Sequence, residues 1–393
     1  MRVIDLFSGA GGFGLGFKRA GASVCCSVEQ DAWACQTIVR NDPLEFILKK
    51  DINFVGAKDL AHLKNKIEVV TASPPCQGFS LAMHPDFRKI DIRNKLVWQV
   101  LRIAELIRPQ AILIENVPGM MSAQLDNGAL LIEKLRIKLN LLGFKSYTSI
   151  LCASRFGVPQ RRKRLFILAA RFPVEDPFPR PTHFYRPANN DDYKDKSLPP
   201  AITLWEAIGN LPPRKAGEGS NEELLFIRPK TEYQKLLSNE SGRMFNHRAM
   251  RHSPRITERF SKVVPGRSGG MLSCPQTGTR KRNGNGEKSV SYFSQNNRRM
   301  HHDQPCHTIT ASFYANFLHP FQHRNFTPRE GARIQSFPDS YKFEGGFNTV
   351  SQKLLSRENR QVAGKLTQYN QIGNAVPPLL AQRLAEHIRS LLR

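Results

Sequence analysis

The sequence predicts an α/β fold with a mostly parallel sheet, joined to a second, smaller part that is rich in loops. Apolar segments of strand length recur through the first 170 residues with helix-like segments between them, which is typical of parallel α/β sheets. After residue 172 the chain becomes rich in proline, and from about 201 to 305 it is basic and only weakly periodic. This change in pattern predicts a second structural unit.

The elements of the first part follow one another closely. Strands are expected at Arg2–Leu6, Ser23–Val28, Ile67–Ala72, Ala111–Ile114 and Arg164–Ala170. Helices are expected at Leu15–Ala20, Asn94–Ile107, Leu130–Leu142 and, near the end of the chain, Pro378–Leu392. Open α/β sheets bind ligands at the carboxyl ends of their strands, so residues that directly follow these strands are the first candidates for a site.

Composition narrows the class of function. The 393 residues include 58 Lys and Arg against 33 Asp and Glu, a formal net charge of +25, which favours a polyanionic partner such as nucleic acid. An apolar content of 40% excludes a mostly disordered chain, and no run of eighteen apolar residues predicts a membrane span. Seven cysteines without a CxxC pair and the lack of a signal-peptide pattern predict a cytoplasmic protein.

A glycine-rich turn follows the first predicted strand. The segment Asp5-Leu-Phe-Ser-Gly-Ala-Gly-Gly-Phe13 leads into a helix, and its glycines would let a ligand approach the backbone. Glu29 ends the next strand, where an acidic side chain suits the ribose hydroxyls of an adenosine cofactor. The pattern fits NAD, FAD or S-adenosylmethionine, and a tight turn without a ligand is the simpler alternative.

Cys76 follows the third predicted strand, within Ser73-Pro-Pro-Cys-Gln-Gly-Phe-Ser80. The two prolines would stiffen the turn and hold the cysteine at the sheet edge, where a thiolate can act as a nucleophile. The alternative is a small buried apolar residue, which is the usual state of a free cysteine. The rigid, glycine-flanked setting favours the functional interpretation.

Two more strands carry polar residues. Glu115 lies at the end of its strand and could act as a proton donor or merely cap the surface. In Gly157–Ile167 the alternation of a strand would place Gln160, Arg162 and Arg164 on one face, with Arg161 and Lys163 on the other. Three polar side chains on one face suit an oxygen or phosphate of a nucleotide, and a basic surface strand is the alternative.

In this order, these blocks resemble the DNA cytosine-5 methyltransferases. DLFSGAGGFGLGF is similar to the first motif of that family, PPCQGFS to its nucleophile motif, ENVPG to its glutamate motif and FGVPQRRKRLFI to its arginine strand. Further similar segments are Asp91–Leu96, Arg329–Asp339, Tyr369–Pro378 and the stretch around Cys306. The resemblance covers roughly 1–170 and 305–393. It implies a methyltransferase with a Rossmann-like sheet and with S-adenosyl-L-methionine as its cofactor.

The resemblance also implies a domain organisation. A catalytic domain is expected at 1–180, a target-recognition domain at 181–317 and a returning segment at 318–393 that completes the catalytic domain. The basic stretch 241–310, with 13 Lys or Arg against 3 Asp or Glu, lies wholly within the expected recognition domain. Its loops are expected to contact phosphates and base edges, and a solvated insertion is the alternative.

The catalytic roles follow from the same resemblance. Cys76 would attack carbon 6 of a cytosine flipped out of duplex DNA, so that carbon 5 can accept a methyl group. Glu115 would hold and protonate ring nitrogen 3, Arg164 would contact the base carbonyl, and Arg162 would support the glutamate, the substrate or a phosphate. The activity implied is that of a DNA (cytosine-5-)-methyltransferase of the restriction-modification type.

The resemblance further implies two sets of binding residues. The cofactor set is Phe7, Ser8, Gly9, Gly11, Gly12, Glu29, Gln30, Asp51, Ile52, Pro75, Leu96, Asn374 and Ala375. The candidate DNA contacts are Gln77, Ser80, Arg88, Gln160, Arg267, Arg280, Lys281 and Arg282. Residues 80–93 would form a loop that closes over the base. Two departures from the family pattern are Ala72-Ser73, in place of two glycines, and Gln30, in place of an apolar residue at the adenine.

Other functions remain open from the residues alone. A tRNA-methylating branch shares this core, but the long basic segment favours duplex DNA. A non-catalytic DNA-binding relative would not need both Cys76 and Glu115, and a nicotinamide-dependent dehydrogenase leaves PPCQGFS unexplained. No metal is expected, because the spacing of the histidines fits no zinc pattern. We expect a monomer in the cytoplasm, near the nucleoid and not at a membrane, with any cognate restriction endonuclease acting separately.

Overall fold

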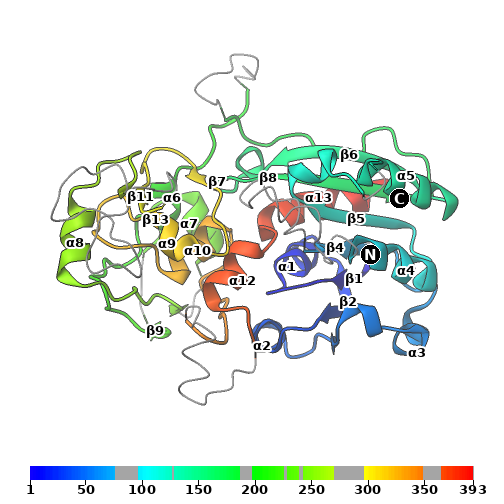
Figure 1. Cartoon of the computed structure of the whole chain (residues 1–393), viewed down its shortest axis with the longest axis horizontal. Coiled ribbons are helices and arrows are strands. Elements are labelled where there is room, and N and C mark those ends of the chain that lie inside the picture. Colours follow the sequence, from blue (N-terminus) through cyan, green and yellow to red (C-terminus); the bar gives the residue numbers. More distant parts are fainter. Residues whose placement is uncertain are drawn as a thin grey trace.

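The structure, a computed structural model, describes residues 1–75, 96–125, 128–185, 197–224, 228–238, 242–269, 296–347 and 364–392. These residues form two lobes (Figure 1). The lobe on the right in that view is built around a seven-stranded sheet, and the lobe on the left consists of short helices and strands joined by loops. The predicted α/β class, with a mostly parallel sheet and a smaller loop-rich part, is confirmed.

The strands of the sheet lie in the order β3-β2-β1-β4-β5-β8-β6. Their bounds are β1 Arg2–Leu6, β2 Ser23–Glu29, β3 Ile47–Lys49, β4 Val69–Ala72, β5 Ala111–Asn116, β6 Lys145–Cys152 and β8 Lys163–Ala170. The first five strands in this order, from β3 through β2, β1 and β4 to β5, pair in parallel. Strand β8 is antiparallel to both of its neighbours, β5 and β6. The strand order reverses between β1 and β4, so the crevice beyond their carboxyl ends is the expected ligand site.

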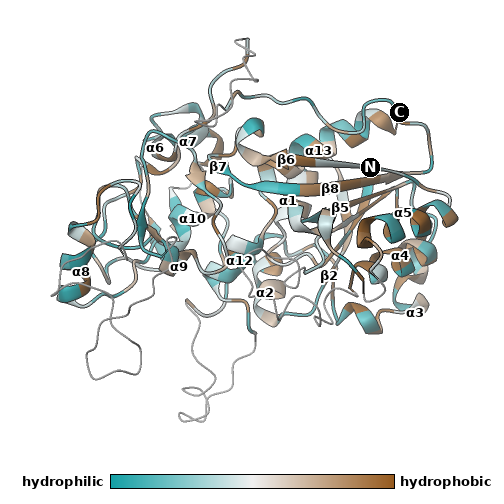
Figure 2. Ribbon diagram, turned by 45° about the horizontal axis from the view of Figure 1, so that its top comes forward, coloured by the Kyte–Doolittle hydropathy of each residue, from teal (hydrophilic) through white to brown (hydrophobic). Residues whose placement is uncertain are grey.

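Each face of the sheet carries its own hydrophobic core, because strands of this kind are buried on both sides. Val3, Val69 and Leu113 point to the face covered by α1 (Gly12–Arg19) and α13 (Pro378–Leu391). The next residue of each strand points to the other face, which is covered by α3 (Ala57–Leu60), α4 (Leu96–Ile107) and α5 (Leu131–Leu141). Figure 2 shows the result as brown strands between helices, and β8 changes from teal at its start to brown.

Most predicted elements of the first part are present, with small shifts of their ends. Helix α1 begins at Gly12 rather than at Leu15, because the glycine turn already enters the helix. The structure adds two strands, β3 and β6, and the helix α2 (Ala32–Asn41). Short 3-10 helices occur at η1 Ile52–Phe54, η2 Ala61–Leu63, η6 Pro118–Ser122 and η7 Ala153–Phe156.

Helix α1 packs very closely against α13, so segments from the two ends of the chain share one lobe (Figure 1). A Cβ atom at Gly16 would lie 2.4 Å from Ala381 Cβ and 2.4 Å from the carbonyl oxygen of Pro378. At Gly12 it would lie 2.5 Å from the carbonyl oxygen of Val376. The glycines of the first motif thus allow helix packing as well as a tight turn.

Gly16→Ala should therefore lower the free energy of unfolding by about 1–3 kcal/mol, since the added methyl group overpacks the α1–α13 contact. Gly14→Ala is the matched control in the same helix: its Cβ would meet nothing closer than 3.4 Å. That variant should be neutral or more stable by up to about 1 kcal/mol, because alanine favours the helix. Urea unfolding followed by circular dichroism measures both, and equal effects would contradict the packing argument.

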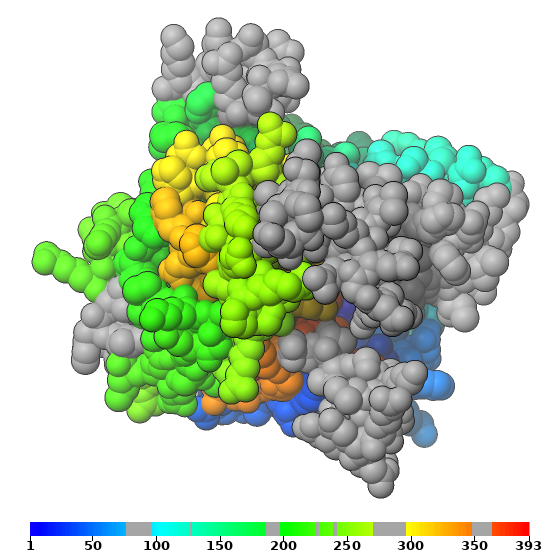
Figure 3. All heavy atoms as spheres, turned by 60° about the vertical axis from the view of Figure 1, so that its left-hand side comes forward, coloured from blue at the N-terminus to red at the C-terminus, as the bar shows by residue number. Residues whose placement is uncertain are grey.

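The second lobe is built from short elements. Its helices are α6 Leu204–Ile208, α7 Glu232–Leu237, α8 Pro254–Ser261, α9 Phe313–Asn316 and α10 Pro328–Ile334. Its strands are β9 Glu222–Leu224, β10 Arg243–Phe245, β11 Arg298–Arg299 and β13 Phe317–Leu318. Turned forward in Figure 3, this lobe shows a surface made mostly of green and yellow to orange segments, which interleave residues from its whole length.

The two lobes are joined rather than separate. Strand β7 (Gln160–Arg161) pairs in parallel with β12 (Cys306–His307) between them. Helix α10 packs against α6 of the second lobe and also against α12 (Gln368–Asn374). One hydrophobic cluster runs from β1 into α6 and α7. The predicted domain boundaries at 180/181 and 317/318 therefore stay predictions.

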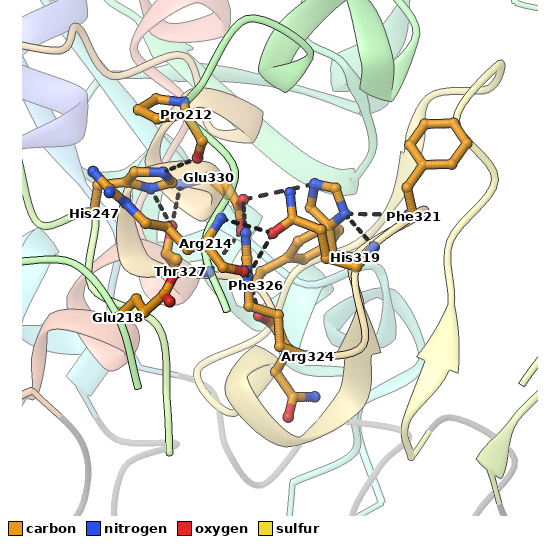
Figure 4. Close-up of polar contacts among 12 residues, drawn as sticks. Pro212, Arg214, Glu218, His247, His319, Phe321, Arg324, Phe326, Thr327 and Glu330 are labelled. Carbon is orange, nitrogen blue, oxygen red and sulfur yellow. Dashed lines mark hydrogen bonds and ion pairs between the residues drawn. The ribbon is translucent and has the colours of Figure 1, made fainter. Parts of the chain in front are cut away.

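A buried ion pair lies inside the second lobe (Figure 4). Both carboxylate oxygens of Glu330 accept hydrogen bonds from Arg324, at 2.8 and 2.7 Å, and neither side chain is more than 2% exposed. Arg324 Nε also donates to the carbonyl of Arg214, and Glu330 closes a capping box with Thr327 at the start of α10. Burial alone would raise the pKa of Glu330, but the charge of Arg324 outweighs it and lowers the pKa to about 2.

Two buried histidines complete this cluster (Figure 4). His319 Nε2 lies 3.7 Å from Glu330 Oε1, and His247 Nε2 donates to the carbonyl of Pro212 at 2.9 Å. Burial lowers the pKa of His247 to about 4 and that of His319 to about 3. Both rings are therefore neutral at neutral pH, so the buried charge of Glu330 is balanced by Arg324 rather than by a histidine.

Candidate active site

The loops that follow four parallel strands are tied together at one edge of the sheet. Gly9 N, after β1, donates to Glu29 Oε2 at the end of β2 at 2.9 Å. Ser73 Oγ, after β4, donates to the carbonyl of Phe7 at 3.1 Å. Asn116 Nδ2, at the end of β5, reaches the carbonyl of Pro74 at 3.5 Å. The predicted site residues after β1, β2, β4 and β5 thus share one continuous surface.

Glu29 is held in one orientation by backbone donors. Its Oε1 accepts the N–H groups of Gln30 and Asp31 at 2.8 Å each, and its Oε2 accepts that of Gly9. Burial raises the pKa of Glu29, although the three backbone hydrogen bonds counteract this. Each carboxylate oxygen has a second acceptor position, so a ribose hydroxyl could donate to Oε2 without displacing a bond.

The glycine turn is strained and partly open. Phe7 has φ +57°, a left-handed conformation that costs energy for a bulky residue and is most often retained at functional sites. Gly9, with φ +54°, has no described heavy atom within 4 Å of where a Cβ would stand. A Cβ at Gly11 would instead lie 3.0 Å from Tyr341 Oη. Gly9 therefore borders open space, whereas Gly11 and Gly12 pack against the chain itself.

Other predicted cofactor residues surround this turn. Asp51 caps the short helix η1, and its Oδ1 accepts the backbone and side-chain N–H groups of Asn53 at 2.9 Å. Ala375 lies against the turn, with its Cβ 3.2 Å from the position of a Cβ on Gly12. The rest differ in exposure: Ser8 and Ile52 are buried, Leu96 is half-buried, and Gln30, Pro75 and Asn374 are exposed. Gln30 thus points to solvent next to Glu29.

Asp5 is a site residue whose role the sequence does not reveal. It is fully buried; its Oδ1 accepts from Thr71 Oγ1 at 2.7 Å and its Oδ2 from Gly14 N at 3.2 Å. Burial raises its pKa to about 7, well above the ordinary value for a carboxyl group. The signal in the sequence is an acid within an apolar strand, and the structure shows that it joins β1, β4 and α1.

Glu115 and Arg164 form an ion pair at the carboxyl end of β5. Arg164 Nε lies 2.9 Å from Glu115 Oε1, and their side chains are only 15% and 9% exposed. The pair forms because β8 runs antiparallel to β5, which brings the start of one strand beside the end of the other. The structure therefore brings together two of the four predicted catalytic residues.

Arg162 lies elsewhere, although Arg162 and Arg164 were expected on one face with Gln160. The chain turns at Arg162 between β7 and β8, with Arg162 N donating to the carbonyl of Gln160 at 2.9 Å. The Arg162 guanidinium is buried and donates to the carbonyls of Ile309 and Gly373. Gln160 is fully buried, with its amide bonded to Ile309 N and Gln335. Both residues anchor β7 to the C-terminal segments, and their predicted contacts with substrate or DNA stay predictions.

Several predicted residues lie outside the described part of the chain. These are Cys76, Gln77, Ser80, Arg88, Arg280, Lys281 and Arg282. Arg267 is described and is exposed on the second lobe. Within the described ranges no three or more metal-binding side chains gather at one place, and no helix there is both long and apolar enough to span a bilayer.

Comparison with known proteins agrees with this geometry. Residues 1–390 match the family described as C-5 cytosine-specific DNA methylase. The chain is 38% identical to the type II methyltransferase M.DdeI of Desulfomicrobium norvegicum, over 99% of this chain and 88% of that protein. It is 32% identical to M1.HphI of Haemophilus parahaemolyticus, over 99% of this chain and 86% of that protein.

Solved structures show the same fold. A DNA modification methyltransferase encoded within an E. coli prophage superposes with a TM-score of 0.73 at 22% identity, covering 100% of this chain and 99% of that one. The S. pombe Dnmt2 methyltransferase does so with a TM-score of 0.55 at 17% identity, with the same coverage. With the whole-chain match, these findings show that the chain belongs to the C-5 cytosine-specific DNA methylase family and is a DNA cytosine-5 methyltransferase.

Proposed function

We propose that the chain methylates carbon 5 of a cytosine flipped out of duplex DNA, at a specific sequence, as the modification enzyme of a type II restriction-modification system. The Glu115–Arg164 pair supports this proposal most directly. It lies at the end of β5, and the neighbouring Asn116 contacts Pro74, two residues before Cys76. A base placed beside Glu115 would thus lie next to the loop that carries the proposed nucleophile.

The strand ends fit S-adenosyl-L-methionine as the methyl donor. Glu29 offers a pre-oriented carboxylate to a ribose, Gly9 borders open space, and Asp51 has an oxygen, Oδ2, without a hydrogen bond to any described residue. When bound there, this cofactor supplies an electrophilic methyl group. Unlike a dinucleotide, it has no pyrophosphate, so the amino-acid end would occupy the glycine turn. Pro75, Leu96, Asn374 and Ala375 would complete the pocket.

The chain's own residues would divide the chemistry as follows. The Cys76 thiolate bonds to carbon 6 of cytosine, which makes carbon 5 nucleophilic. Glu115 holds the proton on ring nitrogen 3 and is itself oriented by Arg164, which also reaches the base carbonyl. After carbon 5 has gained the methyl group, it loses its proton to a base. The bond between sulfur and carbon 6 then breaks, which restores the ring double bond and the thiolate.

The partners follow from the charge and the fold. The proposed target-recognition domain, 181–317, would recognise duplex DNA through Arg267 and the basic residues 280–282, with 1–180 and 318–393 forming the catalytic domain. Residues 77, 80 and 88 would contact DNA around the flipped base. We propose that the enzyme acts as a monomer in the cytoplasm, on nucleoid DNA, and that a cognate restriction endonuclease acts separately.

Incubation with labelled S-adenosyl-L-methionine and either plasmid DNA or tRNA tests the proposal, with bisulfite sequencing to locate the label. Label should enter DNA at cytosines in one sequence context. Cys76→Ser should lose methylation while it still binds the cofactor, because a serine hydroxyl is a far weaker nucleophile than a thiolate. Cys25→Ser, on β2, is the matched control and should stay active. Label in tRNA alone, or an active Cys76→Ser variant, would contradict the proposal.

A further inference from the structure

A small basic cavity lies where β7 meets the second lobe, outside the site described above. Its volume is about 10 Å³, which is room for about one water molecule or one oxygen atom of a larger ligand, and it opens to solvent. The residues that line it are Arg161, Gly266, Arg298, Arg299, Met300, His301, Gln304, Pro305, Cys306 and His307. None of these is Asp or Glu, so every charged side chain in the described lining is cationic. A half-buried cavity with only positive charge is suited to an anion.

Two strand pairings build the cavity. The parallel β7–β12 pair places Arg161 opposite His307, and an isolated bridge joins Arg298 of β11 to Ser268. Arg161 is thus supplied by the strand that leads toward Arg164, while Arg298 comes from the second lobe (Figure 1). The cavity therefore lies at the junction between the lobes.

The arginines of the lining differ in how their nitrogens are used. Arg299 is 4% exposed, and backbone carbonyls, including those of Val263 and His319, accept from its guanidinium. Arg161 is half-buried and donates through Nη1 to the Tyr185 hydroxyl at 2.9 Å, but its Nε is buried without a described acceptor. Arg298 Nε is also buried without one. A buried donor without an acceptor calls for an explanation, and a ligand oxygen supplies it.

The pKa of His307, which also lines the cavity, is affected by the positive charges around it. Burial, the charges of Arg161 and Arg298, and the neighbouring His301 together lower its pKa to about 4. An anion among these groups would reduce their mutual repulsion. It would also raise the pKa of His307, which provides a direct readout of occupancy.

We propose that this cavity accepts one oxygen of a phosphodiester group of the DNA strand that carries the target cytosine, with Arg161 and Arg298 as the ligands of that oxygen. The inference rests on the proposed function and adds a subsite to it. Arg161 precedes Arg164 by three residues, so their Cα atoms are at most about 11 Å apart. That distance suits a phosphate near the nucleotide whose base would lie at Glu115. A contact made from both lobes would also hold them against one strand.

The salt dependence of binding tests this subsite. For duplex DNA, replacing both Arg161 and Arg298 by Gln should reduce the slope of log K against log salt concentration by about 0.9, the value for one lost phosphate contact, and Arg161→Gln or Arg298→Gln alone should reduce it by less. Arg161→Lys should retain most of the slope because it keeps the charge. Arg136→Gln is the matched control: Arg136 is exposed on α5 and pairs with Glu133. Unchanged slopes in both cavity variants would overturn the proposal, and melting temperatures show whether they are folded.

A second measurement uses the unmodified enzyme. The His307 pKa, followed by NMR, should rise when a short duplex is added. A rise with inorganic phosphate but not with the duplex would overturn the DNA assignment. Label transfer by the same preparation distinguishes failure of the proposed function from failure of the subsite. Absence of DNA methylation would refute the proposed function. Methylation with normal salt slopes and an unmoved His307 would refute only the subsite.

Discussion

Glu330→Gln should lower the free energy of unfolding by about 3–5 kcal/mol. The substitution removes the carboxylate but leaves the Arg324 guanidinium buried, and an unpaired buried charge is strongly destabilising. Both carboxylate oxygens bond to Arg324, and both side chains are essentially inaccessible to water. Urea unfolding at pH 7 measures the effect. The matched control is Glu258→Gln on α8, whose exposed pair with Lys262, directly after the helix, should be worth less than about 1 kcal/mol.

The same variant should show a distinct pH dependence. The pKa of Glu330 is about 2 in the folded protein, below its ordinary value of 4.5. Its contribution to stability is therefore fully present above pH 4.5 and is lost as the pH falls toward 2. The stability difference between wild type and Glu330→Gln should be constant near neutral pH and shrink below about pH 4.5. A difference that stays constant down to pH 2 would contradict the assignment of the pair.

The neighbouring histidines add to acid lability. His247 and His319 have folded pKa values of about 4 and 3, below the ordinary 6.5. The unfolded chain therefore binds protons more readily, and stability falls as the pH drops from 6.5 through those values. The charge of Glu330 raises the pKa of both histidines, so in Glu330→Gln their pKa values should be lower still and this loss should continue to lower pH. It begins at higher pH than the loss from the carboxylate, so the two contributions can be separated.

Glu115→Gln should lower the rate of methylation by about 10²–10⁴-fold, because an amide cannot hold or donate the proton at ring nitrogen 3. The change preserves size, so the cofactor should bind as before. Single-turnover label transfer measures the first quantity, and titration with S-adenosyl-L-methionine measures the second. Glu133→Gln, on the exposed face of α5, is the matched control and should keep full activity. A fully active Glu115→Gln enzyme would remove Glu115 from the proposed mechanism.

The central strands could be predicted because they are continuous apolar runs that end at turns. The additional strand β6 could not, since it lies at the sheet edge and its residues are mostly exposed or half-buried. Strand β3 is only three residues long. The expectation that Arg162 and Arg164 share a face assumed one unbroken strand. The hydrogen bond from Arg162 N to the carbonyl of Gln160 interrupts the alternation of side chains between the two faces of the strand. Counting alternate residues in the sequence does not reveal this interruption.

Of the sequence signals, the net charge was the poorest guide to the site, because it does not show which positive side chains are available to a partner. Among the residues that the structure describes, five arginines are almost wholly buried, namely Arg162, Arg299, Arg324, Arg329 and Arg333. They bond to carbonyls or carboxylates of the chain itself rather than to a polyanion. The positions of Glu29 and Glu115 could be predicted, because the topology of a parallel sheet places the ends of their strands at one edge. Which cations face solvent depends on tertiary packing.

The close contact of α1 with α13 also constrains how the protein is made. One face of the central sheet is covered by residues that the ribosome adds more than 350 positions after α1. The nascent chain must therefore carry apolar strands with an incomplete cover until the last helix emerges. Contacts of such sequence separation form slowly, and exposed apolar surface promotes aggregation meanwhile. Synthesis of an active enzyme should accordingly depend on chaperones that shield this face, more than its final stability would suggest.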